Sequence, residues 1–190
     1  MDRPKVDLHE KQAEAIERLN DKTSRFILFG GGAEGGKSWL GWCWLIDNCL
    51  RWPGTRWFCG RQELKRLRGT TLPTFFKVVN EYGIPSQIYN YNGSDHYIKF
   101  ANGSRIDLLE LKYYPSDPMY QRFGSFEFTG GWIEEAGEVN FGAFDILKVR
   151  IGRHMNRQYE ATPSKMLLTC NPAKNWLYTT FFMPWKKGEL

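Results

Sequence analysis

The sequence is poor in the residues that build metal and disulfide sites. It contains 4 cysteines and 3 histidines, no two cysteines have C-x-x-C spacing, and the histidines lie far from the cysteines and from one another. These absences exclude a zinc site of the usual spacing. Scattered cysteines in a chain without a leader indicate a reducing compartment, where they are small buried residues or inert thiols.

Long apolar segments are also missing. No stretch approaches the roughly 18 apolar residues that a membrane span requires, and residues 1–7 lack the apolar core of a signal peptide. The sequence contains no internal repeat and no low-complexity linker. We therefore expect a cytosolic protein without a membrane partner.

The composition is that of an ordinary globular chain with many aromatic rings. A length of 190 residues suits one α/β domain with a real core, and no second domain is needed. The content of 8 Trp and 13 Phe is high, so some of these rings must be partly exposed. The net charge of +5 fits a polyanion partner and equally a plain basic surface, so charge alone decides nothing.

The most informative feature is a complete G-x-x-x-x-G-K-[ST] phosphate-binding loop at residues 31–38. It lies between the apolar run 26–29 and an expected helix, whose N-terminal dipole favours an anion. Glycines let backbone N–H groups point at a triphosphate such as ATP, Lys37 reaches the β- and γ-phosphates, and the Ser38 hydroxyl binds Mg²⁺. The predicted nucleotide-binding residues of the loop are Gly31, Gly32, Ala33, Glu34, Gly35, Gly36, Lys37 and Ser38. A glycine-rich turn that happens to precede Lys-Ser is the alternative, which the full spacing disfavours.

Two adjacent acids follow a second apolar strand. The sequence W-I-E-E ends in the carboxylate pair Glu134 and Glu135, and such a strand end places one acid near Mg²⁺ and the other near the water that attacks the γ-phosphate. Glu134 is predicted to hold the metal ion, directly or through its water shell, and Glu135 to polarise the water. An exposed acidic pair at a strand end is the alternative, which the phosphate-binding loop disfavours.

Asn171 follows the apolar strand 165–170, at the end where open α/β sheets bind their ligands. Such a residue can contact the γ-phosphate or its water, although an ordinary Asn-Pro turn would look the same. Phosphoryl transfer also needs positive charge, which an arginine finger supplies in cis or from a neighbouring subunit. The arginines considered for this catalytic role are Arg61, Arg66, Arg68 and Arg122. A solvated basic helix is the alternative for the basic segment.

Strands and helices alternate along most of the chain. Helices are expected at 8–19, from the phosphate-binding loop to 51 and at 72–82, and strands at 25–29, 55–60, 126–133 and 165–170. Residues 97–100 and 105–109 flank an Asn-Gly turn and predict a β-hairpin. The predicted fold class is therefore α/β, with a mainly parallel central sheet flanked by helices and an added antiparallel hairpin.

Taken in order, these motifs resemble the ATPase half of the large terminase subunits of tailed phages. The resemblance spans residues 12–172 and includes a Gln in the first helix, the phosphate-binding loop, the basic segment 61–68 and Arg-x-Gly shortly before the acidic pair. Its more specific elements are G-W-I-E-E-A-G-E-V at residues 131–139 and L-L-T-C-N-P at residues 167–172. The resemblance implies a P-loop NTPase of the ASCE (RecA-like) type.

The resemblance also implies a function, namely a motor that uses ATP hydrolysis to thread double-stranded viral DNA into a procapsid. Gln12 would read the adenine, Arg122 would be presented across a subunit interface, and residues 169–171 would couple hydrolysis to movement. The implied partners are double-stranded DNA, the portal protein and the small terminase subunit, in the cytoplasm of an infected bacterium. The chain would form a homo-oligomeric ring on the procapsid and be monomeric alone.

Two further expectations concern the extent of the activity. Family members continue into an RNase H-like nuclease domain, which does not fit in the remaining residues, so residues 1–190 are expected to form a single ATPase domain without DNA cleavage. The alternatives that stay open are a helicase or DNA-repair ATPase and a switch protein that binds ATP without hydrolysing it. Hydrolysis stimulated by proheads would mark the packaging motor, and tight ATP binding without turnover would mark the switch.

Overall fold

The computed structural model of the chain describes residues 9–32, 36–159 and 164–189. Its centre is a seven-stranded sheet in the order β1-β7-β6-β2-β5-β4-β3. The strands β1, β7, β6, β2 and β5 are parallel, and β4 and β3 continue the sheet with antiparallel pairing. This arrangement confirms the predicted fold class, including the hairpin. The strands are β1 (Phe26–Gly30), β2 (Arg56–Arg61), β3 (Tyr89–Asn92), β4 (Tyr97–Phe100), β5 (Arg105–Glu110), β6 (Gly130–Ile133) and β7 (Met166–Cys170).

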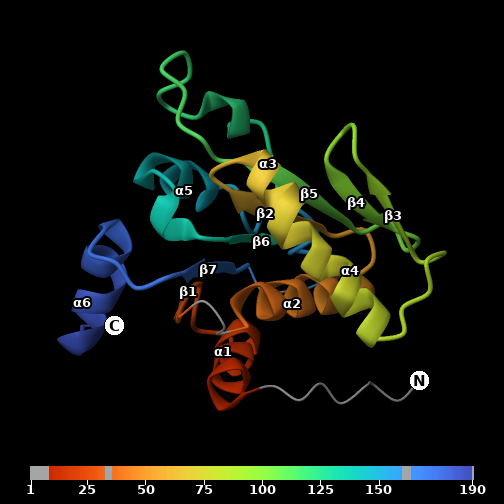
Figure 1. Cartoon of the computed structure of the whole chain (residues 1–190), viewed down its shortest axis with the longest axis horizontal. Coiled ribbons are helices and arrows are strands. Elements are labelled where there is room, and N and C mark those ends of the chain that lie inside the picture. Colours follow the sequence, from red (N-terminus) through yellow and green to blue (C-terminus); the bar gives the residue numbers. More distant parts are fainter. Residues whose placement is uncertain (1–8, 33–35, 160–163, 190) are drawn as a thin grey trace.

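Helices cover both faces of the sheet, with α2 and α4 on one side and α5 on the other (Figure 1). The helices expected before the phosphate-binding loop, after it and at 72–82 are confirmed as α1, α2 and α4. No helix in the described parts of the chain is long and apolar enough to cross a membrane. The helices are α1 (Glu10–Asn20), α2 (Lys37–Arg51), α3 (Leu64–Arg66), α4 (Leu72–Glu81), α5 (Phe141–Leu147) and α6 (Met183–Lys186), with shorter turns at η1 (Leu67–Thr71), η2 (Gln121–Phe123), η3 (Ala136–Glu138) and η4 (Tyr178–Phe182).

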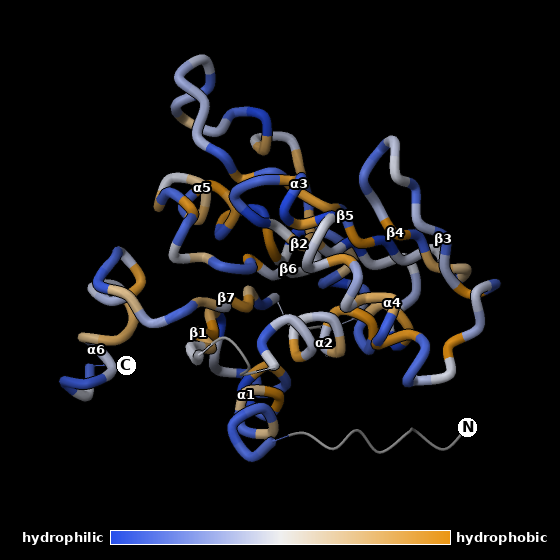
Figure 2. The backbone as a smooth tube through the Cα atoms, in the orientation of Figure 1, coloured by the Kyte–Doolittle hydropathy of each residue, from blue (hydrophilic) through white to orange (hydrophobic). Residues whose placement is uncertain are grey.

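The side chains of the central strands alternate between two apolar clusters. Trp57, Cys59 and Trp132 lie on the face covered by α2 and α4, whereas Phe58 and Ile133 lie on the opposite face. Because successive residues of a strand point to opposite faces, a strand buried on both sides is apolar along its whole length. Figure 2 shows this pattern as orange backbone at β7, while the backbone of α3 at the surface is blue.

The four cysteines are buried free thiols. Burial raises the pKa of Cys43 to about 11, so this thiol stays protonated at neutral pH. These observations confirm the expectation of small buried cysteines, and they explain why none of them contributes a reactive thiolate at neutral pH.

The contact between α2 and β6 depends on a glycine. The Trp132 indole of β6 donates from Nε1 to Oγ1 of Thr169 at 2.9 Å. A Cβ at Gly41 of α2 would come within 2.5 Å of the indole ring, which is closer than packed carbon atoms approach. Glycine at this position therefore lets the helix that follows the phosphate-binding loop lie directly on the strand that carries the two acids.

We expect Gly41→Ala to lower the free energy of unfolding by about 1–3 kcal/mol, because overpacking against Trp132 outweighs the better helix propensity of alanine. Denaturant unfolding followed by circular dichroism measures the change. Gly69→Ala is the matched control, since nothing outside the local helix lies within 4 Å of its added Cβ, and it should be neutral or slightly stabilising. Equal stability of Gly41→Ala and the wild-type protein would contradict this packing.

Candidate active site

Three parallel strands end side by side at the candidate site. β1 leads into the phosphate-binding loop, β6 into the acidic pair and β7 into Asn171. β7 lies between the other two, with Gly30 opposite Cys170 and Ile133 opposite Leu168. Because the carboxyl ends of parallel strands form the ligand-binding edge of an α/β sheet, the topology brings three motifs that are far apart in sequence to one place.

The phosphate-binding loop ends at a residue that must be glycine. Gly36 precedes α2 with a left-handed backbone at φ 62°, and a Cβ there would come within 2.3 Å of the side-chain nitrogen of Gln12. Both the conformation and the available space therefore require glycine. The first turn of α2 follows directly, and its backbone N–H groups without helical partners favour an anion. Outside the described residues lie Ala33, Glu34 and Gly35.

The Lys37 ammonium group is held at the loop by oxygen atoms. Its Nζ donates to the carbonyl oxygens of Gly31 and Gly32, both at 2.8 Å, and to Oδ1 of Asn171 at 3.0 Å. The residue is 7% exposed. Because these three acceptors are uncharged, they fix the ammonium group without neutralising it, and its charge stays available for an anion in the loop.

Asn171 connects this lysine to the second acid of the pair. Its Oδ1 accepts from Lys37, and its Nδ2 donates to Oε2 of Glu135 at 3.2 Å. Glu135 has a left-handed backbone at φ 48°, which is uncommon for a residue with a side chain. Backbone strain of this kind is concentrated at functional sites, and it turns the Glu135 side chain to the cavity described below.

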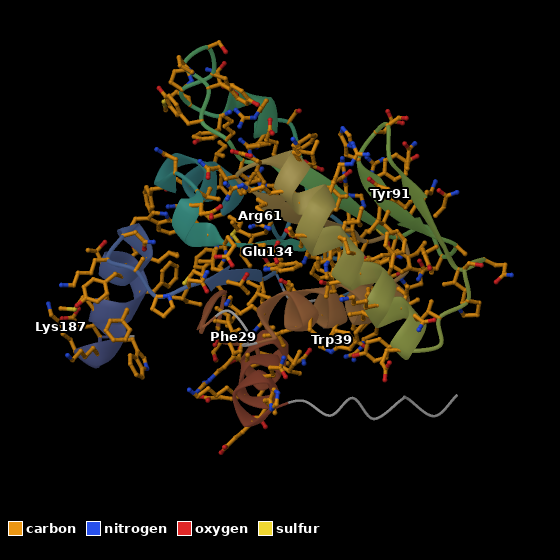
Figure 3. The ribbon with its side chains drawn as sticks, viewed as in Figure 1. Phe29, Trp39, Arg61, Tyr91, Glu134 and Lys187 are labelled. Carbon is orange, nitrogen blue, oxygen red and sulfur yellow. The ribbon has the colours of Figure 1, made fainter. Side chains whose placement is uncertain are left out.

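The first acid, Glu134, is buried and hydrogen-bonded on both carboxylate oxygens. Oε1 accepts from the Ser38 hydroxyl, whereas Oε2 accepts from the Thr71 hydroxyl and lies 3.5 Å from Nη1 of Arg61. Figure 3 shows Arg61 and Glu134 next to each other at the centre of the molecule. Burial raises the pKa of Glu134, while the hydrogen bonds from Ser38 and Thr71 and the charge of Arg61 oppose this shift.

The donor set around Glu134 fits a magnesium ion. A hydroxyl and a carboxylate oxygen in direct contact are the oxygen ligands that Mg²⁺ uses together with phosphate oxygens and water. Ser38 and Glu134 are therefore the residues that would hold the ion, as the sequence predicted.

A cavity of about 350 Å³ opens beside these residues, between the phosphate-binding loop, α4 and the acidic pair. Lysine, hydroxyl and carboxylate groups thus face one polar space that is large enough for a polyphosphate. The lining residues are Gly36, Lys37, Ser38, Trp39, Thr74, Glu135 and Asn171.

Gln12 lies against the phosphate-binding loop. Its Nε2 donates to the carbonyl oxygen of Gly36 at 3.1 Å, and its Oε1 accepts from the backbone N–H of His9 at 3.0 Å. With both ends of the amide engaged and only 4% of the residue exposed, Gln12 connects α1 to the loop. Its role in reading adenine stays a prediction.

The arginines of the basic segment take different places. Arg61, at the end of β2, contacts the acidic pair through Glu134. Arg66 forms surface ion pairs with Glu63 at 3.6 Å and with Glu138 at 3.4 Å. Arg68 is exposed, and in the described parts of the chain it has no ion pair. Arg61 is thus the arginine of this segment that the fold brings to the site.

Arg122 is held within its own loop. It donates to Oδ2 of Asp117 at 2.8 Å and to the carbonyl oxygen of Lys112 at 2.6 Å, and its guanidinium lies 4.5 Å from the ring centroid of Phe123. This segment lies at the top of Figure 1, away from the phosphate-binding loop. The fold therefore does not bring Arg122 to the site of its own subunit, and its role as a finger stays a prediction.

Two threonines belong to the site although no motif marks them. Thr71 of η1 contacts Glu134, and Thr74 of α4 lines the cavity. Their spacing of three residues places both hydroxyls on one side of a helix. Two hydroxyls on the buried side of a predicted helix are a signal that could have been noticed.

The parallel sheet, the phosphate-binding loop between β1 and α2, and the acidic pair at the same edge define a P-loop NTPase domain of the RecA-like type. A sequence model described as phage terminase large subunit matches residues 23–189. The chain therefore belongs to the phage terminase large subunit family. No curated protein matches the sequence.

Solved large terminases have the same fold. The large terminase of a thermophilic bacteriophage is 13% identical with a TM-score of 0.71, and the matched region covers 94% of this chain and 43% of that one. The large terminase of bacteriophage HK97 is 12% identical with a TM-score of 0.68, covering 97% of this chain and 38% of the other. A mutant ATPase domain of the Thermus phage P74-26 large terminase is 15% identical with a TM-score of 0.61, covering 94% and 71%. This chain thus spans less than half the length of the first two.

Proposed function

We propose that this chain hydrolyses ATP to ADP and phosphate, and that hydrolysis drives double-stranded viral DNA into a procapsid. The observation that carries the proposal is the contact of Asn171 with both Lys37 and Glu135 beside one polar cavity. Family membership supports the packaging role. The large terminase of the thermophilic bacteriophage has been solved with ADP and with ATP-γ-S, which supports nucleotide binding by this chain.

Each residue has a defined role in the proposal. Lys37 exchanges the loop carbonyls for oxygens of the β- and γ-phosphates, and Ser38 and Glu134 hold Mg²⁺, which would neutralise phosphate charge when bound. Glu135 orients and polarises the attacking water from the rim of the cavity. Asn171, which contacts Lys37 and Glu135, reports to the acid whether the lysine is occupied by phosphate.

The proposal also includes the assembly. Arg122 acts in trans, so the active form is a homo-oligomeric ring on the portal of a procapsid, with the small terminase subunit as a further partner, in the host cytoplasm. Residues 1–190 contribute ATP hydrolysis as one ATPase domain and do not cleave DNA.

The test is phosphate release by the purified chain over a range of protein concentrations, with and without double-stranded DNA and portal-bearing procapsids. Turnover per subunit should rise with concentration, and Arg122→Ala should remove the rise, a loss on the order of a thousandfold for a finger in trans. Arg68→Ala, an exposed arginine of the same chain, is the comparison and should keep it. Tight ATP binding without turnover under every condition would contradict the proposal and favour a switch protein.

A further inference from the structure

The carboxylate of Glu134 is held differently at its two oxygens. Oε2 has two partners, the Thr71 hydroxyl and the guanidinium of Arg61. Oε1 has one partner, the Ser38 hydroxyl of the phosphate-binding loop. The two groups on Oε2 come from η1 and β2, and neither lines the cavity. The oxygen on the loop side therefore has a hydroxyl beside it, while the opposite oxygen is fixed by groups outside the loop.

Thr71 owes its position to a π-helical turn. The backbone N–H of Leu72 bonds to the carbonyl oxygen of Leu67, five residues back, which inserts one extra residue before α4. Thr71 is 1% exposed, and its carbonyl oxygen accepts from Nε1 of Trp42 in α2 at 2.8 Å. The threonine is thus fixed on one side by α2 and offers its hydroxyl to Glu134 on the other.

Arg61 completes the same arrangement. Its Nη1 donates to Oγ1 of Thr70 at 2.6 Å and to Oγ1 of Thr71 at 3.2 Å, in addition to its ion pair with Glu134. Because Thr71 accepts from Arg61, its hydroxyl hydrogen is directed to the carboxylate. Arg61 and Thr71 act together on one oxygen atom.

We propose that Thr71 and Arg61 are positioning residues that fix the Glu134 carboxylate by Oε2, so that Oε1 faces Ser38 and the magnesium ion of the bound nucleotide. This inference rests on the proposed function, since it takes Glu134 as the acid beside that ion. Groups that orient a metal ligand commonly change metal affinity by about 10- to 100-fold when they are removed.

The experiment measures the affinity of ATP-γ-S by calorimetry, once with Mg²⁺ and once with EDTA, and takes the ratio of the two affinities. Thr71→Val removes the hydroxyl and keeps the shape, so it should lower this ratio about tenfold while the affinity in EDTA stays that of the wild-type protein. Thr71→Ser restores the hydroxyl and should restore the ratio. This split distinguishes positioning from general damage, which would weaken both affinities.

The matched control is Thr55→Val. Thr55 is also fully buried, and its hydroxyl bonds to the carbonyl oxygen of Trp52 before β2, at the other end of this strand from the site. It should lose comparable stability and keep the wild-type ratio. If Thr71→Val does not fold, Arg61→Gln tests the same inference and should lower the ratio in the same way.

The outcomes separate the inference from the proposed function. A wild-type ratio in folded Thr71→Val, or in Arg61→Gln where it is needed, would overturn the positioning role. A wild-type protein that binds ATP-γ-S without any effect of Mg²⁺ would overturn it as well. A wild-type protein that binds no ATP-γ-S in either condition would overturn the proposed function itself.

Discussion

Lys37→Ala should reduce phosphate release from ATP by at least about a hundredfold, because the variant lacks the positive charge aimed at the β- and γ-phosphates. The structure supports a large effect, since three hydrogen bonds fix the Lys37 ammonium group at the loop before any ligand enters. An ammonium group that is already in place costs little reorganisation when phosphate binds. Steady-state phosphate release, together with nucleotide binding by calorimetry, measures both consequences.

The control for this variant is Lys187→Ala. Lys187 is an exposed lysine of the C-terminal helical region, and Figure 3 shows it far from Glu134. Its removal changes the net charge by the same amount without touching the loop, so turnover should stay at the wild-type rate. Wild-type turnover in Lys37→Ala would mean that this loop does not bind the reacting nucleotide.

Glu135→Gln should lower turnover by about 10²- to 10⁴-fold and leave nucleotide binding intact. Glutamine keeps the length of the side chain, and its carbonyl oxygen can still accept the hydrogen bond that Glu135 accepts from Asn171 at 3.2 Å. The substitution therefore removes the negative charge that polarises water while it preserves the local contact. A selective loss of turnover, with the affinity for ATP unchanged, is the expected signature.

Glu127→Gln is the matched control for the second acid. Glu127 is exposed and precedes β6, at the opposite end of the strand from Glu135. The two variants change the same functional group by the same chemistry, and only the position differs. Loss of ATP binding in Glu135→Gln would contradict the assigned role, because it would make the acid part of the binding surface.

The main features of the site were predictable because each lies in a contiguous stretch of sequence. The loop at 31–38 carries its own glycines, lysine and serine, and the acids and Asn171 each come directly after an apolar strand. Parallel strands place their carboxyl ends at one edge, so strand endings alone predict that these groups meet. The structure brings Lys37, Glu135 and Asn171 together, while their catalytic roles stay predictions.

The contribution of Thr71 and Arg61 could not be predicted in this way. Thr71 reaches Glu134 through a π-helical turn, and no local residue pattern distinguishes such a turn from an ordinary helix start. Arg61 was one of several arginines in a basic segment, and its position at the end of β2, beside β6, is a consequence of strand order. Tertiary neighbours, rather than local sequence, select these two residues.

Some elements were missed for local reasons. α5 has only seven residues and contains Gly142, so its periodicity is too short to recognise. β3 alternates Tyr and Asn, a period of two whose polar members hid the strand. The strand expected at 126–133 begins only at Gly130, because Phe128 instead pairs with Ile151 in an isolated bridge.

The most direct test of the account identifies the nucleotide that remains on the protein after incubation with labelled ATP and Mg²⁺. If the chain hydrolyses ATP at the site formed by Lys37, Glu135 and Asn171, the wild-type protein should carry ADP and Glu135→Gln should carry ATP. Recovery of intact ATP from both proteins, at a protein concentration that allows subunits to meet and with DNA and procapsids present, would contradict the account.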